Sequence, residues 1–210
     1  MLRALALVAL ISCGKSSSRQ LDHDLIRVTS DANLRTDTIG DGKFTDLATF
    51  VLVEAENTSK EGAHVTLDGD LTDERGAVVG QLRAQSLWIP PGELRTFALI
   101  DKQRKPRPNA KAARVRVRGA YVPAHPPPMT VDGVREIPDN DKLVVQGVVK
   151  NPVARGGNVM VYATFWGANG KPLTRPFSLM WIAPNGTQPV QFVGPPGSKR
   201  ATIFLGDMAY

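Results

Sequence analysis

The chain has 210 residues, with 26 lysines and arginines against 20 acidic residues and a formal net charge of +6. A single cysteine excludes a disulfide within the chain and a zinc site built from several thiolates. An aromatic content of 6% argues against an aromatic platform for carbohydrate binding. No stretch of eleven or more residues carries apolar side chains at helical spacing, so the sequence predicts an all-β protein.

The first twelve residues have the composition of a secretory signal peptide. One charge, Arg3, precedes an uninterrupted apolar run over residues 4–11, and the small Ser12 ends the segment. The apolar run is far shorter than the roughly 20 residues that a membrane-spanning helix needs. We therefore expect residues 1–12 to be removed, with no transmembrane helix.

The segment Leu10-Ile11-Ser12-Cys13 resembles the lipobox of bacterial lipoproteins. The resemblance implies cleavage between Ser12 and Cys13, lipid attachment at Cys13, and membrane association through that lipid. Gly14 stands where inner-membrane lipoproteins of enteric bacteria carry aspartate, which favours the outer membrane, facing the periplasm. An ordinary signal peptide with a chance cysteine is the alternative. Residues 13–21 are rich in serine and are predicted to be a flexible tether.

The first predicted domain covers residues 22–120. Alternating or β-branched segments, bounded by turn residues, predict its strands. These strands are expected at 25–28, 50–56, 64–71, 77–89, 94–100 and 113–117. Residues 29–47 are rich in Asp, Thr and Gly and are predicted to form a long surface loop. Asp73-Glu74-Arg75-Gly76 has the composition of a hairpin turn whose glycine takes a positive φ.

Residues 121–128 contain consecutive prolines and are predicted to be a semi-rigid linker. The second predicted domain, residues 129–210, repeats the first with a shift of 94 positions. The shift places Asn57 on Asn151, Leu71 on Phe165 and Gly76 on Gly170. The sequence therefore predicts two tandem β-sandwiches of one kind.

The segment Leu143–Asn151, with Gly-x-Val before the asparagine, resembles the FxLYD type of bacterial immunoglobulin-like domain. The segments Trp88–Glu93 and Ala112–Val117 resemble small YcfL-type envelope lipoproteins. Both resemblances imply an immunoglobulin-like β-sandwich in the cell envelope. Neither implies a binding residue that could be carried over to this chain.

Candidate catalytic and metal-binding groups are few. His23, His64 and His125 are widely separated and share no metal-ligand spacing. The segments Asp68-Gly69-Asp70 and Asp139-Asn140-Asp141 lack the glycine and glutamate frame of a calcium-binding loop, so strand and turn roles are expected. We predict no catalytic residue, no metal and no cofactor, and no enzymatic activity.

One segment is strongly basic. Residues 22–101 hold seven basic and fifteen acidic residues, whereas residues 102–118 hold eight basic residues and no acidic one. The eight are Lys102, Arg104, Lys105, Arg107, Lys111, Arg114, Arg116 and Arg118. The last three arginines alternate with Val115 and Val117, so a strand would place all three on one face. Such a segment attracts anionic membrane surfaces or polymers, and neutralisation by the acidic residues 22–101 is the alternative. The expected compartment argues against nucleic acid.

We therefore expect a non-enzymatic envelope lipoprotein, a scaffold or binding module with an envelope protein as partner. Binding of an anionic envelope polymer or membrane surface through residues 102–118 is the alternative.

Overall fold

The computed structural model describes residues 18–29, 32–39 and 45–209. The predicted signal peptide, the cleavage site at Ser12 and Cys13 and most of the tether lie outside these residues. The described chain is built of strands plus a single 3-10 turn, η1 (His23–Leu25), which confirms the all-β prediction. In these residues no helix has the length and apolar character required to cross a bilayer.

The first sandwich consists of two antiparallel sheets. Sheet A has the order β1-β8-β5-β6, and in sheet B the strands β2 and β3 pair along one edge of β4 while β7 pairs along the other. Its strands are β1 (Arg19–Gln20), β2 (Ile26–Val28), β3 (Asn33–Ile39), β4 (Asp46–Asn57), β5 (Ala63–Thr72), β6 (Val78–Ile89), β7 (Leu94–Ile100) and β8 (Ala112–Val122).

The second sandwich repeats this arrangement. Sheet C has the order β14-β10-β9, and in sheet D the strands β12 and β13 pair along one edge of β11 while β15 pairs along the other. Its strands are β9 (Thr130–Asp139), β10 (Lys142–Lys150), β11 (Gly157–Trp166), β12 (Pro172–Thr174), β13 (Phe177–Ile182), β14 (Thr187–Val193) and β15 (Arg200–Ala209).

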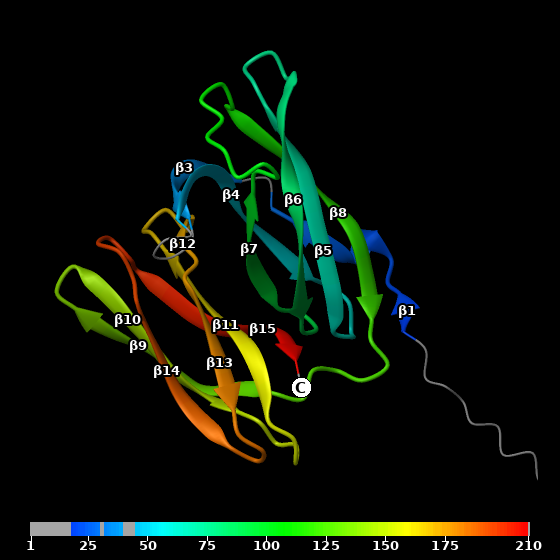
Figure 1. The fold of residues 1–210 in the computed structure, drawn as a ribbon, viewed down its shortest axis with the longest axis vertical. Coiled ribbons are helices and arrows are strands. Elements are labelled where there is room, and N and C mark those ends of the chain that lie inside the picture. Colours follow the sequence, from blue (N-terminus) through cyan, green and yellow to red (C-terminus); the bar gives the residue numbers. More distant parts are fainter. Residues whose placement is uncertain (1–17, 30–31, 40–44, 210) are drawn as a thin grey trace, which may run out of the picture.

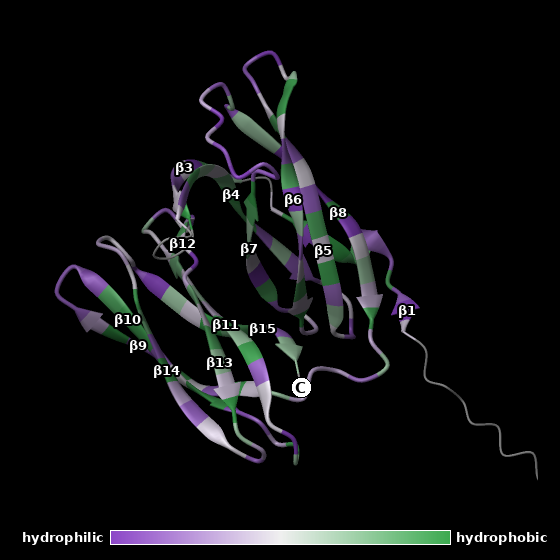
Figure 2. Cartoon of the chain, viewed as in Figure 1, coloured by the Kyte–Doolittle hydropathy of each residue, from purple (hydrophilic) through white to green (hydrophobic). Residues whose placement is uncertain are grey.

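Each sandwich has its own apolar core, formed by the period-two alternation of its strands. Along β5, Val65 and Leu67 are fully buried and alternate with half-buried polar residues, an alternation that Figure 2 shows as bands along the strand. The equivalent residues of β11, Val159 and Val161, are also fully buried. Strands of this pattern place alternate side chains on one face, so the two facing sheets close over them.

The predicted sequence repeat has a detailed structural counterpart. In the first sandwich the amide nitrogen of Asn57 donates to the carbonyls of Glu61 (2.7 Å) and Ile89 (3.0 Å). In the second, Asn151 donates to the carbonyls of Arg155 (2.8 Å) and Ala183 (3.0 Å). Each partner is displaced by the same 94 positions, so both asparagines fix the same loop to the same strand end.

Turn chemistry recurs at the repeat spacing as well. Gly76 has φ +78° and Gly170 has φ +73°, the left-handed conformation that glycine adopts without a Cβ penalty. This confirms the predicted positive φ at Gly76.

The prediction of a surface loop at residues 29–47 was wrong. Strand β3 lies inside this range and pairs with β4, from Asn33 opposite Leu52 to Ile39 opposite Asp46. The hydroxyl groups of Thr36 and Thr49 are 2.7 Å apart across the two strands. Asp, Asn and Thr made the segment resemble a loop, but a strand on the sheet edge needs few apolar side chains once its partner supplies the backbone hydrogen bonds.

Ordered structure also extends into the predicted tether and linker. Arg19 and Gln20 pair with Val122 and Tyr121 of β8, and Leu21 is buried with 4% of its surface exposed. The tether segment therefore joins the first sandwich from residue 19 onward, and β8 continues into the segment that precedes the prolines.

The four sheets form four layers in the order A, B, D and C, as Figure 1 shows. The outer face of sheet B contacts the outer face of sheet D. Across this contact the indole nitrogen of Trp166 on β11 donates a hydrogen bond to the carboxylate of Glu54 on β4, at 2.7 Å. Tyr162 and Phe204 of sheet D are buried and belong to the apolar cluster of the first sandwich. The outer faces of sheets A and C lie at the two ends of the stack.

Candidate functional site

The basic segment occupies the loop after β7 and the first part of β8. Arg114, Arg116 and Arg118 are exposed and alternate with the half-buried Val115 and Val117. The three guanidinium groups therefore share the outer face of sheet A, as the alternation predicts.

Three of the eight basic side chains form ion pairs with acidic residues from the range 22–101. Arg104 pairs with Asp46 at 2.6 Å, and Arg107 pairs with Asp101 at 2.8 Å. Arg116 contacts both Asp68 (2.9 Å) and Asp70 (3.0 Å). Its hydrogen bond to Asp70 and the charge of Asp68 raise the pKa of Arg116 above its ordinary value.

The pair formed by Arg107 and Asp101 has a structural task. The side chain of Asp101 is fully buried and also accepts the backbone N–H of Gln103 at 3.0 Å. The backbone N–H of Arg107 donates to the Thr49 hydroxyl at 2.7 Å. A buried carboxylate with several donors fixes the path of a loop, so this pair holds the segment between β7 and β8 onto β4.

The other five basic side chains, Lys102, Lys105, Lys111, Arg114 and Arg118, have no ion pair within the described part of the chain. Two of them line a hollow of about 380 Å³ on the outer face of sheet A. Its charged side chains are Asp68, Asp70, Arg83, Lys102, Arg116 and Arg118. Four cations and two carboxylates give this hollow an excess of positive charge that suits an anionic group.

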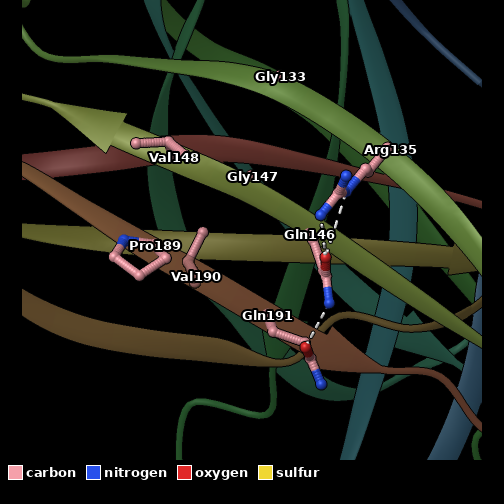
Figure 3. A pocket seen from close by; sticks show the side chains of 8 residues that line it. All are labelled: Gly133, Arg135, Gln146, Gly147, Val148, Pro189, Val190 and Gln191. Carbon is pink, nitrogen blue, oxygen red and sulfur yellow. Dashed lines mark hydrogen bonds between the residues drawn. The ribbon is translucent and has the colours of Figure 1, made fainter.

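A second hollow, of about 610 Å³, lies on the outer face of sheet C. Figure 3 shows a row of polar side chains across it: both Arg135 and Gln191 are hydrogen-bonded to Gln146. The Arg135 guanidinium donates to the side-chain oxygen Oε1 of Gln146 at 3.0 Å. The side-chain nitrogen of Gln146 in turn donates to Oε1 of Gln191 at 2.6 Å. The pairing of β9 with β10 has a register shift beside this row, between Gln146 and Val148.

A third surface is apolar and lies on β13, at an edge of sheet D. Phe177, Leu179 and Trp181 are 59%, 65% and 58% exposed, and their alternation places all three on the outer face of the sheet. We call these three residues the β13 stripe. Exposed large apolar side chains that adjoin one another mark contact surfaces more often than isolated ones do.

The β13 stripe borders the contact between the two sandwiches. The ring of Phe177 lies 6.1 Å from that of Tyr162, which stacks on Phe204 at 5.3 Å. The guanidinium of Arg175 lies 4.3 Å from the centre of the Tyr162 ring, and burial lowers the pKa of Arg175 to about 10. Arg175 therefore stays charged at neutral pH and contributes a cation–π contact to this region.

The histidines and acidic pairs lie apart from one another. Within the described residues no three histidine, aspartate, glutamate or cysteine side chains gather where a metal ion could bind. His64 stacks on Tyr121 at 5.1 Å and lies 5.4 Å from the Trp88 ring. Burial lowers the pKa of His64, an effect that the charge of Asp207 partly opposes.

The sequence predicted the basic side chains but missed the β13 stripe. The segment Phe-Ser-Leu-Met-Trp-Ile has apolar residues on both faces, a pattern typical of a strand that is covered on both sides. Only the strand order places it at an edge, so no signal in the segment itself could identify the exposed side.

Comparisons with known proteins add no assignment. No family model matches the chain, and no curated protein matches it. A DUF1425 family member from Shewanella has a TM-score of 0.35 at 12% identity, covering 38% of this chain and 77% of that one. Red sea bream transglutaminase has a TM-score of 0.26 at 15% identity, covering 85% and 29%. A tandem CBM22 structure from Paenibacillus barcinonensis Xyn10C has a TM-score of 0.16 at 8% identity, covering 90% and 88%.

These scores are too low to support an argument about function. The chain is an all-β protein of four antiparallel sheets that form two sandwiches.

Proposed function

We propose that the chain is a non-enzymatic lipoprotein of the bacterial cell envelope that acts as a protein-binding or scaffold module. In this proposal Cys13 carries the lipid, and the chain is held at the outer membrane on its periplasmic side. The lone cysteine directly after a short apolar segment supports the anchoring. Fatty-acid labelling tests it: the Cys13→Ser variant should incorporate no label and leave the membrane fraction.

The observation that carries the binding function is the β13 stripe. Three large apolar side chains, each more than half exposed, adjoin one another on an edge strand that has no charged residue. Burying such side chains contributes about 1.5–3 kcal/mol each, so covering the stripe would provide most of the affinity of a moderate protein contact.

The test is affinity capture from detergent-solubilised envelopes. Wild-type chain is compared with Leu179→Lys and with a matched control, Val193→Lys, since Val193 is 53% exposed on the edge strand β14. The proposal expects one protein to be retained by wild type and by the control and lost with Leu179→Lys. Equal retention by all three chains would contradict it.

Binding of an anionic envelope polymer or membrane surface is the second candidate. The hollow lined by Lys102, Arg83 and Arg118 supports it, since Lys102 and Arg118 have no carboxylate partner within the described residues. The affinity for anionic vesicles should then fall steeply as the salt concentration rises. The double variant Lys102→Glu, Arg118→Glu should abolish this binding. The Arg104→Gln variant is the control, because Arg104 already pairs with Asp46. Salt-insensitive binding would contradict this candidate.

A further inference from the structure

The edge that carries the β13 stripe lacks the usual protection of exposed strands. Edge strands of soluble proteins commonly carry lysine, proline or a bulge that prevents pairing with another chain. The strand Phe177–Ile182 contains no charged residue and no proline, and its pairing with β11 runs without a register shift. Within the described residues β13 pairs with β11 alone, so its other edge offers unpaired backbone groups.

The internal repeat shows that these apolar residues are not a requirement of the fold. In the second sandwich, Trp181 and Leu179 of β13 lie opposite Asn158 and Met160 of β11. In the first sandwich, the equivalent positions are Trp88 and Ser86 of β6, which lie opposite His64 and Thr66 of β5. The first sandwich therefore has Ser86 where the second has the exposed Leu179. Stability of the sandwich alone does not explain a leucine at this position.

The two equivalent tryptophans also differ in what covers them. Both pack over a glycine: a Cβ at Gly62 would come within 2.2 Å of Trp88, and one at Gly156 within 2.7 Å of Trp181. Trp88 is half-buried and lines a hollow with Pro126 and Pro127 of the linker. In the first sandwich the linker thus borders the same hollow as the half-buried tryptophan, whereas Trp181 is 58% exposed.

The β13 stripe continues an existing contact. Phe177 contacts Tyr162, which is buried between the two sandwiches on the same face of sheet D. A protein bound to the stripe would therefore extend an apolar interface that is already formed. The packing of Trp181 over Gly156 also holds the indole ring in place before any partner binds.

From these observations we infer that β13 pairs antiparallel with β13 of a second copy of this chain, which makes sheet D continuous through a symmetric dimer. This inference rests on the proposed binding function and names its partner. A twofold axis at Leu179 places Leu179 opposite its own counterpart and Phe177 opposite Trp181 of the second copy. Directly opposed residues of antiparallel strands share a face, so the two stripes form one cluster.

The chemistry of the strand favours a second copy over a charged peptide. The stripe has no ionisable group to complement a charged partner, and its order of ring, leucine and ring is nearly the same in both directions. Registers shifted by one residue would place the two stripes on opposite faces of the sheet, and registers shifted by two residues would keep them on one face but oppose fewer of their side chains. The register centred on Leu179 therefore gives the largest contact between the stripes.

Disulfide trapping tests both the pairing and its register. Cys13 is the only cysteine, so the full chain with Cys13→Ser gives a background without thiols. In detergent, Leu179→Cys should form disulfide-linked dimers, because opposed residues lie within the distance that a disulfide spans. A mixture of Phe177→Cys and Trp181→Cys chains should give more dimer than either alone. The control is Val193→Cys, at a position that is 53% exposed on the edge strand β14, and it should stay monomeric.

A second measurement uses chains without new cysteines. Leu179→Lys should weaken dimerisation at least about hundredfold, since two leucines leave the interface and two like charges meet, while Val193→Lys should leave it unchanged. A monomeric wild type, or trapping of Leu179→Cys no stronger than that of Val193→Cys, overturns the dimer. If that monomer still retains an envelope protein that Leu179→Lys loses, the proposed binding function stands and the dimer alone fails.

Discussion

The two sandwiches have the same strand arrangement but opposite chemistry on equivalent faces. Tyr162 and Phe204 are paired across β11 and β15 and are buried in the contact between the sandwiches. At the equivalent positions of sheet A stand Asp68 and Arg116, also paired across two strands but linked by an ion pair between an exposed arginine and a half-buried aspartate. The fold is the same in both, and the side chains determine which face is covered.

The other pair of equivalent faces shows the same difference. Leu52 on the outer face of sheet B is 1% exposed, and its equivalent in sheet C is Gln146, a member of the polar row in Figure 3. Sheet A is the equivalent of sheet D, and sheet C is the equivalent of sheet B. If the repeat were exact, sheet A of one molecule could therefore bind sheet C of another, as sheet D contacts sheet B, and the chains would polymerise. Charged and amide side chains on these end faces oppose such stacking, whereas the β13 stripe at the edge of sheet D consists of three apolar side chains.

The largest expected effect is at the buried side of the comparison. Phe204→Ala should lower the free energy of unfolding by about 3–5 kcal/mol, because a 1% exposed ring would leave a cavity between the sandwiches. Arg116→Ala at the equivalent exposed position should change it by less than about 0.5 kcal/mol. Urea unfolding followed by tryptophan fluorescence measures both. Similar losses for the two variants would show that the faces do not differ as described.

The repeated asparagines test whether the two sandwiches unfold together. Asn57→Ala and Asn151→Ala each remove two hydrogen bonds to backbone carbonyls and should each cost about 2–3 kcal/mol. Because the sandwiches share an apolar contact, both variants should shift one common unfolding transition. Two separate transitions, each sensitive to a single variant, would mean that the contact does not couple the sandwiches.

Much of the fold could be predicted from the sequence, because its signals are local. Alternation predicted the strand around Val65, turn chemistry predicted the positive φ at Gly76, and the 94-residue shift predicted that the arrangement repeats around Val159. The contact between sheets B and D could not be predicted. It joins Glu54 to Trp166, 112 positions apart, and neither residue has a periodic pattern that points to the other.

The site was predictable only in part, for the same reason. The alternation of Arg114, Arg116 and Arg118 predicted a shared face, but the sequence could not show which of them pair with carboxylates. That depends on strand register, which places Asp68 opposite Arg116. The β13 stripe depends on strand order, which a run of apolar residues does not encode.

A smaller effect is expected where one repeat replaces an acid by an apolar residue. Glu54 accepts the Trp166 indole N–H, and its equivalent in the second sandwich is Val148. Glu54→Val should leave that donor without a partner and cost about 1–3 kcal/mol, whereas Val148→Glu at the half-buried equivalent, which removes no hydrogen bond, should cost less. Thermal unfolding of the two variants measures the difference, and a stabilised Glu54→Val would show that burial of the carboxylate outweighs its hydrogen bond.

The smallest effect concerns pH. Burial lowers the pKa of His64 below its unfolded value of 6.5, so the folded state binds fewer protons than the unfolded state in this range. The stability contributed by neutral His64 is therefore complete above pH 6.5 and is lost as the pH falls below it. The equivalent residue in the second sandwich is Asn158, which lies opposite Trp181 as His64 lies opposite Trp88 and does not titrate.

The variant His64→Asn copies the second sandwich at this position and should reduce the acid sensitivity of the whole chain. Urea midpoints at pH 7.5 and 5.0 should differ less for His64→Asn than for wild type, because the variant has no imidazole to protonate on unfolding. His125→Asn in the linker is the control, since His125 is exposed and has no ring packed against it in the described residues. If wild type and His64→Asn had the same dependence on pH, the acid sensitivity would come from groups other than His64.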